Sequence, residues 1–214
     1  MDSRIRDGIR AALPLAIAPL LFGASFGLLA VDAGLGRIGA ITMSATTFAG
    51  SAQFAATSIL DSGGGVAAAI LAALLLNARY VPLSMAVASI FPGSRRRRFL
   101  EAQLIVDESW ALSGRSGRFL HPVLLGAGLV LFVTWVGGTA LGTVAGDLLD
   151  PDAIGLGAAF PALFLALLAP YLRSSRALTT AVVAGAITLV LLPLTPPGVP
   201  IVAAAAAALI GLRR

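Results

Sequence analysis

Residues 119–146 read FLHPVLLGAGLVLFVTWVGGTALGTVAG, a stretch without a single Asp, Glu, Lys or Arg. The hydrocarbon core of a bilayer is about 30 Å thick, and a helix needs about 20 consecutive apolar residues to cross it. Inside the bilayer the backbone must satisfy its hydrogen bonds within the protein, which a helix does. The stretch therefore predicts a transmembrane helix.

Other apolar runs of similar length lie upstream. Uncharged residues fill 11–31 and 38–60, and only Arg79 interrupts the run over 62–94. Each run is long enough to cross the bilayer. The segment 95–118 mixes charged residues with short apolar patches. It is predicted to be a cytoplasmic connection that forms a loop, an interfacial helix or a re-entrant piece.

Two more apolar runs follow downstream, over 153–172 and 177–212. Prolines at 193, 196, 197 and 200 interrupt the second run, which is therefore expected to form two short helices joined by a turn. Together the runs predict an all-α fold, a polytopic transmembrane helical bundle of about seven apolar segments, some of them broken or re-entrant. In this interpretation residues 1–214 form a single transmembrane transporter domain.

Composition excludes several classes of protein. The chain is 58% hydrophobic and 12% charged, whereas an average soluble domain is about 25% charged. Its formal charge is +5, but the arginines form short clusters between apolar runs, without the basic helix or interleaved aromatics of a nucleic-acid-binding protein. There is no Cys, one His, and no phosphate loop or nucleophile elbow. We expect no enzyme activity, no cofactor, no metal and no nucleic-acid partner.

The arginine clusters orient the later segments. Cytoplasmic loops of membrane proteins carry an excess of Lys and Arg. The clusters within 95–98, 115–118, 173–176 and 213–214 all fall on one side if each later segment crosses once. That side is predicted to be the cytoplasm, which places the chain in the inner membrane with its C-terminus inside.

The orientation of the N-terminus stays open at this stage. Seven simple crossings would leave the arginines at 4, 6 and 10 outside. A re-entrant hairpin over 38–60, bent at Ala49-Gly50-Ser51, would return them to the cytoplasm, which the positive-inside rule favours.

A weak internal similarity favours the opposite orientation. Gly23-x3-Gly27 followed by Phe48-Ala49-Gly50 resembles Gly138-x3-Gly142 followed by Phe160-Pro161-Ala162. Repeat halves over 11–94 and 119–194, connected by 95–118, would be inverted if each crossed three times, and the N-terminus would then lie outside. The glycine spacing is also an ordinary signal for helix packing in membranes.

Arg79 is the clearest functional candidate. An ionisable residue at membrane depth costs a few kcal/mol and seldom faces lipid. Asn77 and Pro82 flank it, so a kinked helix is predicted, with Asn77 and Arg79 facing a substrate pathway where the cation pairs with a carboxylate. The alternative is a structural arginine that pairs with Asp107 or Glu108 or extends to the interface.

A second group of candidates lies in the sequence TTFAGSAQF, residues 46–54. Gly50 and Ser51 permit close backbone approach, and Gln53 supplies an amide that needs partners if it is buried. A broken helix beside a substrate cavity fits this pattern, and so does tight helix packing through small residues. Gly50, Ser51 and Gln53 are therefore candidate substrate-binding residues with a packing role as the alternative.

Adjacent carboxylates at Asp107 and Glu108 form the third group. Neighbouring residues on a helix point about 100° apart, so both are not expected to face one cavity. One of them is expected to carry a proton or hold Arg79 while the other meets solvent; the alternative is two solvated carboxylates. His121, at a membrane boundary, is expected to be interfacial, with a proton-relay role as the alternative.

The chain resembles the AzlC-type branched-chain amino-acid exporters, the large subunit of the two-component LIV-E family. The resemblance rests on motifs in the family's order: Phe22-Gly23-x2-Phe26-Gly27, Phe48-Ala49-Gly50-Ser51-Ala52-Gln53-Phe54, Asn77-x-Arg79-Tyr80, Asp107-Glu108-Ser109-Trp110-Ala111 and Phe160-Pro161-Ala162-Leu163-Phe164. The chain departs from the family's pattern at Tyr80, where His is frequent, and at Val106, where Thr is usual.

The resemblance implies export of leucine, isoleucine and valine, with methionine as a further substrate, driven by the proton gradient. It also implies a small AzlD-type membrane subunit as partner. A zwitterion with an aliphatic side chain needs a cation or a helix N-terminus for its carboxylate and an apolar pocket for its tail. A transporter or channel for another small amphiphile, a membrane-embedded enzyme and a structural membrane subunit are the competing classes.

Overall fold

The computed structural model describes residues 3–115, 118–145, 165, 169, 172–196 and 199–207. The chain divides into two compact units, one formed by Met1–Phe54 and Leu76–Gly146, the other by Ala55–Leu75 and Asp147–Arg214. Apart from one antiparallel pair of two-residue strands, β1 (Gly114–Arg115) and β2 (Arg118–Phe119), the regular elements among the described residues are helices. The predicted all-α class is confirmed.

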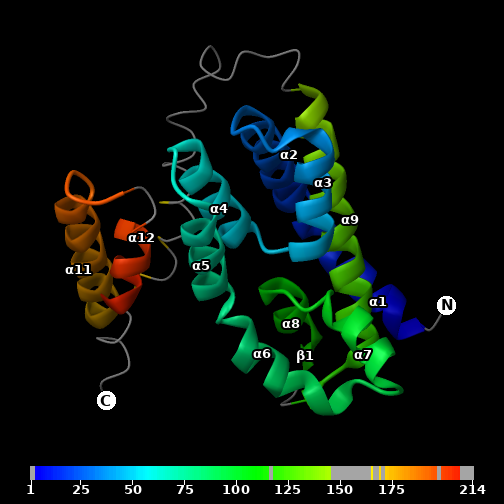
Figure 1. Ribbon diagram of the computed structural model, residues 1–214. Coiled ribbons are helices and arrows are strands. Elements are labelled where there is room, and N and C mark those ends of the chain that lie inside the picture. Colours follow the sequence, from blue (N-terminus) through cyan, green and yellow to red (C-terminus); the bar gives the residue numbers. More distant parts are fainter. Residues whose placement is uncertain are drawn as a thin grey trace. The chain divides into compact units, whose positions relative to one another are not determined.

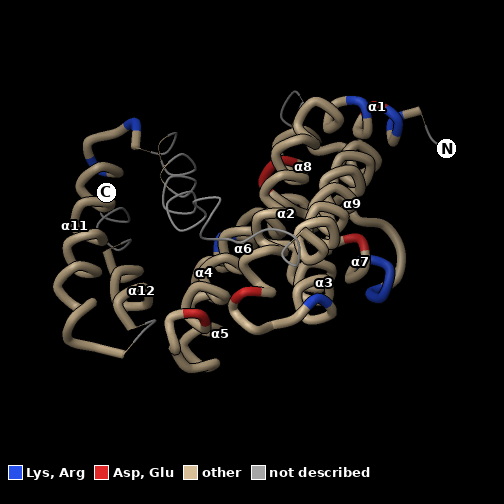
Figure 2. Tube along the Cα trace, turned by 90° about the horizontal axis from the view of Figure 1, so that it is seen from above, with Lys and Arg blue, Asp and Glu red and all other residues tan. Residues whose placement is uncertain are grey.

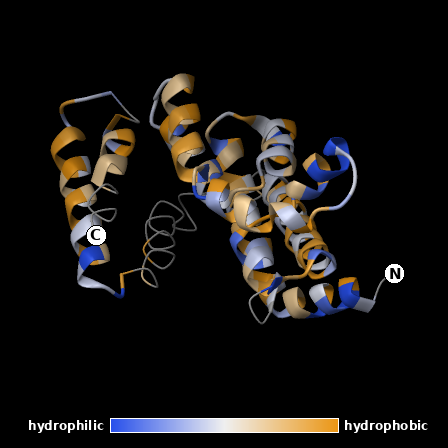
Figure 3. Cartoon of the chain, turned by 90° about the horizontal axis from the view of Figure 1, so that it is seen from below, coloured by the Kyte–Doolittle hydropathy of each residue, from blue (hydrophilic) through white to orange (hydrophobic). Residues whose placement is uncertain are grey.

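The larger unit is built around α9 (His121–Ala145), which is long and apolar enough to cross a bilayer without a break. Beside it lie α1 (Ser3–Ala12) and α2 (Ile17–Asp32), as Figure 1 shows. A short 3-10 turn, η1 (Leu13–Leu15), joins these two helices, which are bent by 62° and by length and composition can form one broken span. In Figure 3, α1 alternates hydrophilic and hydrophobic residues beside the N-terminus, as an interfacial helix does.

Glycines allow α2 and α9 to pack backbone against backbone. A Cβ on Gly23 or Gly27 would overlap backbone atoms of α9, and a Cβ on Gly138 or Gly142 would overlap backbone atoms of α2. The predicted small-residue packing face is thus present at both motifs. Gly146, the third glycine of the later series, lies outside the described residues.

The two helices run in the same direction. Gly23 lies against the backbone of Trp135, and Gly27, one turn later, lies against that of Thr139. Inverted repeats based on the two glycine motifs would place them on antiparallel helices. The observed parallel course gives that arrangement no support, and the division into repeat halves stays a prediction.

Helices α3 (Gly36–Thr47) and α4 (Gly50–Asp61) form a hairpin whose tip lies beside the middle of α9. At the tip Phe48 adopts a left-handed φ of 41°, and its ring contacts that of Phe132 at 5.1 Å. From there the first turn of α4 runs back toward α2, because the Phe54 ring lies 5.8 Å from that of Phe26. The helix is broken between Thr47 and Gly50, about one residue before the predicted bend at Ala49-Gly50-Ser51. The chain turns sharply at this break (Figure 1).

A second break separates α5 (Val66–Asn77) from α6 (Tyr80–Val87), which are bent by 42°. This confirms the kink predicted around Arg79. Another 3-10 turn, η2 (Ala88–Ile90), ends the segment, and a buried cluster then anchors it beside the beginning of α9. The cluster consists of Val87, Phe91, Ile105 and Leu124.

The polar segment after this cluster forms two short helices, α7 (Arg95–Ala102) and α8 (Asp107–Ser113), which we call the α7–α8 hairpin. Leu104, at the tip of this hairpin, packs against Gly128 of α9. Gly128 lies roughly 10 Å along α9 from the first residue of that helix. The segment then returns, because the Leu120 amide donates a hydrogen bond to the Ser113 carbonyl. Neither helix is long enough to span lipid, as predicted.

In the smaller unit, the described part of the last apolar run forms α11 (Ser175–Leu191), α12 (Val199–Ala204) and the 3-10 turn η4 (Ala205–Ala207). The predicted division of this run at its prolines is confirmed. Most of the run over 153–172, the Phe160-Pro161-Ala162 motif and the C-terminal arginines lie outside the described residues.

Candidate functional site

Arg79 occupies the break between α5 and α6, and the local sequence explains why the helix stops there. Asn77 ends α5, and Pro82 is the third residue of α6. Proline has no N–H group, so it is tolerated in the first turn of a helix and not in the interior. A helix that restarts at Tyr80 meets this requirement, and it leaves Arg79 at the N-cap of α6.

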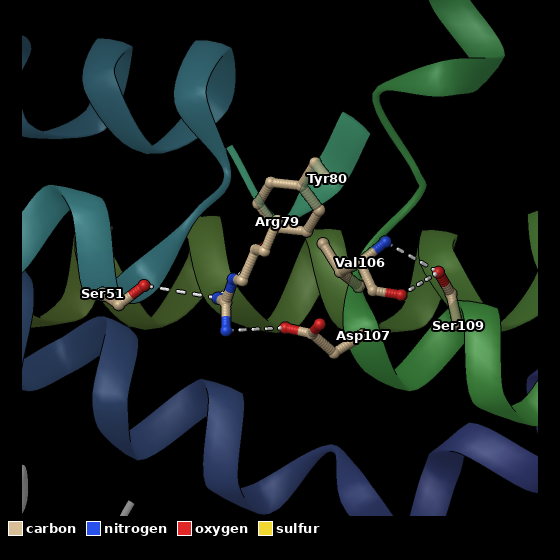
Figure 4. Close-up of polar contacts among 6 residues, drawn as sticks. All are labelled: Ser51, Arg79, Tyr80, Val106, Asp107 and Ser109. Atoms are coloured by element: carbon tan, nitrogen blue, oxygen red, sulfur yellow. Dashed lines mark hydrogen bonds and ion pairs between the residues drawn. The ribbon is translucent and has the colours of Figure 1, made fainter. Parts of the chain in front are cut away.

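The Arg79 guanidinium joins three parts of the larger unit (Figure 4). Its Nη1 lies 3.1 Å from Asp107 Oδ2, and its Nη2 donates to Ser51 Oγ at 3.3 Å and to the Tyr80 hydroxyl at 3.4 Å. The guanidinium carbon also stands 5.1 Å from the centre of the Tyr80 ring, within cation–π range. The Arg79 and Asp107 side chains remain 42% and 38% exposed.

Two partners of Arg79, Ser51 and Asp107, lie in the first turn of a helix. Ser51 is the second residue of α4, and Asp107 is the first residue of α8. Unpaired N–H groups and the helix dipole make the first turn favourable for negative charge. Ser109 fixes the start of α8, since its Oγ accepts from the Val106 amide at 3.0 Å and donates to the Leu104 carbonyl at 2.7 Å.

Gln103 connects the tips of the two hairpins. Its Nε2 donates to the carbonyl oxygens of Thr46 at 2.8 Å and Ala45 at 3.4 Å. These carbonyls belong to the last turn of α3, where helical partners are missing. The side chain therefore ties the α7–α8 hairpin to the end of α3, next to the helix whose first turn carries Ser51. Sequence reasoning missed this residue, although an amide between two short helices was a usable signal.

Gln53 and Gly50 lie behind the site. Gln53 is fully buried, and its Oε1 accepts from the Trp135 indole at 3.1 Å and the Ala49 amide at 3.2 Å. Its Nε2 donates to Ser44 Oγ at 2.9 Å. A Cβ on Gly50 would stand 2.6 Å from the Trp135 ring. Both residues therefore have the packing contacts that the alternative for this stretch predicts, and their assignment to substrate binding stays a prediction.

The remaining candidates differ in their surroundings. The Asn77 Oδ1 atom is buried and has no hydrogen-bond partner among the described residues. Glu108 is exposed, whereas Asp107 is half-buried against Arg79. Asp107 thus pairs with Arg79 while Glu108 does not, and which of the two carries a proton stays a prediction. Within the described residues no group of three or more His, Cys, Asp or Glu side chains could hold a metal ion.

A second ionisable group lies where α9 begins, between His121 at the first residue of that helix and Glu101 on α7. His121 Nε2 is 2.8 Å from Glu101 Oε2, and Glu101 Oε1 accepts from Arg97 Nε at 2.8 Å. Partial burial raises the pKa of Glu101, but the hydrogen bonds from Arg97 and His121 outweigh it and leave that pKa below its ordinary value. The carboxylate is therefore charged at neutral pH and holds both neighbours.

These motifs can be compared with known proteins. A sequence model described as AzlC protein matches residues 14–149, which include both hairpins, the break at Arg79 and the carboxylates on α8. The chain belongs to the AzlC family. The resemblance drawn from the motifs is thereby confirmed.

The relatives of this AzlC protein include membrane proteins from distant organisms. A protein of Archaeoglobus fulgidus described as an uncharacterized membrane protein is 35% identical, over 96% of this chain and 93% of its own length. The branched-chain amino acid transport protein AzlC of Bacillus subtilis is 28% identical, over 76% of this chain and 67% of its own. A membrane protein of Helicobacter pylori is 25% identical, over 76% of this chain and 73% of its own length. No solved structure matches. The chain is thus a membrane protein of a transport family.

Proposed function

We propose that this AzlC protein exports branched-chain amino acids, with leucine, isoleucine and valine as substrates and methionine as a further one. One observation carries the proposal: an accessible Arg79–Asp107 ion pair at a helix break, between the first turns of two other helices. The name of the Bacillus subtilis relative supports this choice of substrate class.

The ion pair offers complementary groups to an α-amino acid. Its carboxylate would bind the Arg79 guanidinium and the Ser51 hydroxyl, at the favourable end of α4. Its ammonium would bind Asp107, with the unpaired Asn77 Oδ1 as a second acceptor. A half-exposed ion pair contributes at most about 1 kcal/mol, so a zwitterion that forms charge-assisted bonds with both partners can separate them.

Proton coupling follows from the same exchange. In the structure Asp107 is paired with Arg79. A substrate carboxylate that draws the guanidinium away frees the Asp107 carboxylate. The substrate's ammonium group and a proton then compete for Asp107. A proton on Asp107 would release the substrate, which couples export to the proton gradient; exposed Glu108 is the second candidate for this step.

The distribution of arginine gives the larger unit an orientation, which we include in the proposal. Figure 2 shows basic residues on α1 and on α7. Both helices lie at the end where α9 begins, since Gly8 faces Val123 and Glu101 contacts His121. The positive-inside rule places that end, and the N-terminus, in the cytoplasm of a cell with the protein in its inner membrane. The α3–α4 hairpin then enters from outside and α7–α8 from inside.

The proposal includes a small AzlD-type membrane subunit as partner, as the resemblance implies. The test uses cells that express the chain with and without a candidate subunit of this type. Efflux of preloaded radiolabelled leucine is measured with and without a protonophore. Export that needs the gradient supports the proposal, and its absence in cells with confirmed insertion and a present partner contradicts it.

Arg79→Lys is the sharpest variant for this test. Lysine keeps the charge but cannot bind a carboxylate in the bidentate manner of arginine. We expect efflux at low substrate concentration to fall about 10- to 100-fold, which corresponds to the loss of one charge-assisted hydrogen bond. Arg98→Lys, at an exposed position of α7, is the matched control and should retain wild-type efflux. Undiminished efflux in Arg79→Lys and Arg79→Ala would remove Arg79 from the site.

A further inference from the structure

His121 and Glu101 contact each other away from Arg79, and neither has a role in the substrate binding proposed above. Their side chains are 13% and 15% exposed, and the atoms that join them are 2.8 Å apart. The Phe91 ring covers the imidazole edge-on at 5.1 Å. Removing one partner of a nearly buried pair is costly, because the other is left buried without a partner. The pair therefore holds α7 firmly to α9.

The α7–α8 hairpin transmits this attachment to the transport site. Glu101 is followed by Gln103, which binds the last turn of α3, and then by Asp107, which binds Arg79. The segment between Glu101 and Asp107 is short and is braced by Ser109. A displacement of α7 from His121 would thus shift Asp107 relative to Arg79.

We propose that His121 and Glu101 are positioning residues for the Arg79–Asp107 pair, and that a proton on His121 strengthens the attachment that keeps Asp107 in place. Histidine is the side chain whose charge ordinarily changes between pH 5 and 8. An imidazolium binds a carboxylate as an ion pair, whereas a neutral imidazole offers a single weaker hydrogen bond. The attachment of α7 to α9 is inferred from contacts alone. Its effect on transport rests on the proposed function.

The other charged groups at this end do not replace the histidine. Arg97, on the same helix as Glu101, binds its other oxygen and stays charged across this pH range. The elements packed here also carry exposed or distant groups, namely Arg4, Arg6, Asp7 and Arg10 on α1, Arg95, Arg96 and Arg98 on α7, Arg118 on β2, and Asp107 and Glu108 at the opposite end of α8. The described part of α6 and η2 contributes no charged residue.

Amide hydrogen exchange of the α7–α8 hairpin tests the attachment directly. Protection factors, corrected for intrinsic exchange, are measured on the full chain in lipid nanodiscs at about pH 6 and about pH 8. In the wild type we expect protection of the hairpin to fall about five- to tenfold at the higher pH. His121→Arg carries a permanent cation and should keep high protection at both values, whereas Glu101→Gln should have low protection at both. Arg98→Gln, on the exposed side of α7, is the control and should behave as wild type.

Leucine efflux by the same variants, over the same internal pH range, separates this inference from the proposed function. A half-saturating leucine concentration that rises with pH in the wild type and stays constant in His121→Arg supports a positioning role. Protection that is independent of pH in the wild type, or equal pH dependence in wild type and His121→Arg, overturns the inference whether or not leucine is exported. Absent efflux together with pH-dependent protection supports the attachment and contradicts the proposed substrate.

Discussion

At the scale of single residues, polar groups that serve the site differ from those that support it. Gln53 has its amide satisfied by Ala49, Ser44 and Trp135, and it has no exposed surface. Arg79 and Asp107 satisfy each other while staying open to solute. Moving a buried, fully paired side chain breaks several hydrogen bonds at once, whereas a half-exposed ion pair can exchange partners at little cost in free energy.

Gln53→Leu is expected to destabilise the protein without changing the site's charges. The substitution leaves the Trp135 indole and the Ala49 amide without their common acceptor, at a cost of about 1–3 kcal/mol for buried groups. Unfolding by a denaturing detergent, followed by tryptophan fluorescence, measures this loss. Leucine transported per folded molecule should remain within about twofold of wild type. A variant of unchanged stability that cannot bind leucine would instead make Gln53 a substrate ligand.

The carboxylate of Glu101 gives a second residue-scale prediction, on acid stability. Burial raises its pKa, but hydrogen bonds from Arg97 and His121 lower it further than burial raises it. A group whose pKa is lowered by folding stabilises the native state above its unfolded pKa of about 4.5, and this stabilisation disappears as the pH falls through the lower folded value.

The expected signature is therefore a pH-dependent difference between wild type and Glu101→Gln. The variant should be less stable by about 1 kcal/mol at neutral pH, and the two proteins should converge below about pH 4. Thermal unfolding in mild detergent measures both curves. A constant difference over the whole pH range would show that the charge of Glu101 does not contribute.

At the scale of elements, the sequence predicted α9 and the kink at Arg79, but it did not predict the 62° bend between α1 and α2 or which surfaces meet. Hydropathy revealed α9 as a span, and Pro82 with Asn77 marked the kink at Arg79. The role of Gln53 could not be assigned because an amide in a small-residue helix fits a cavity and a packed interior equally well. Deciding between them required Trp135, which is distant in sequence and adjacent in space.

The packing of α2 on α9 yields a matched pair of substitutions. A Cβ on Gly138 would overlap the backbone of α2, whereas a Cβ on Gly137 would meet nothing within 4 Å. Gly138→Ala should therefore destabilise the protein by about 1–3 kcal/mol through overpacking. Gly137→Ala should leave stability unchanged or raise it by up to about 1 kcal/mol, since alanine favours helix over glycine. Denaturing-detergent titrations of both variants provide the comparison, and equal effects would contradict the observed helix interface.

At the scale of the whole molecule, the parallel course of α2 and α9 has a consequence for topology. Both helices begin at the same end of the larger unit, because Gly8 precedes α2 and faces Val123 near the start of α9. Two hairpins and one bent helix lie between them in sequence. The chain can return to its starting side only if one of the two segments before α7 crosses and the other does not. We propose that the α3–α4 hairpin is the one that turns back, because Phe48 at its tip contacts Phe132 in the middle of α9.

The absence of cysteine makes this topology directly testable. Single substitutions Ala33→Cys, before α3, and Ser62→Cys, after α4, should react with a membrane-impermeant maleimide from the same, external side of intact cells, because a re-entrant hairpin begins and ends on one side. Ser3→Cys and Arg96→Cys should react only after the membrane is permeabilised if the arginine-rich end faces the cytoplasm, as we propose. Labelling of Ala33→Cys and Ser62→Cys from opposite sides would mean that α3 and α4 cross the bilayer together. In that case the substrate could not reach Arg79 and Ser51 by passing between two hairpins that enter from opposite sides, and its path to the site would have to be different.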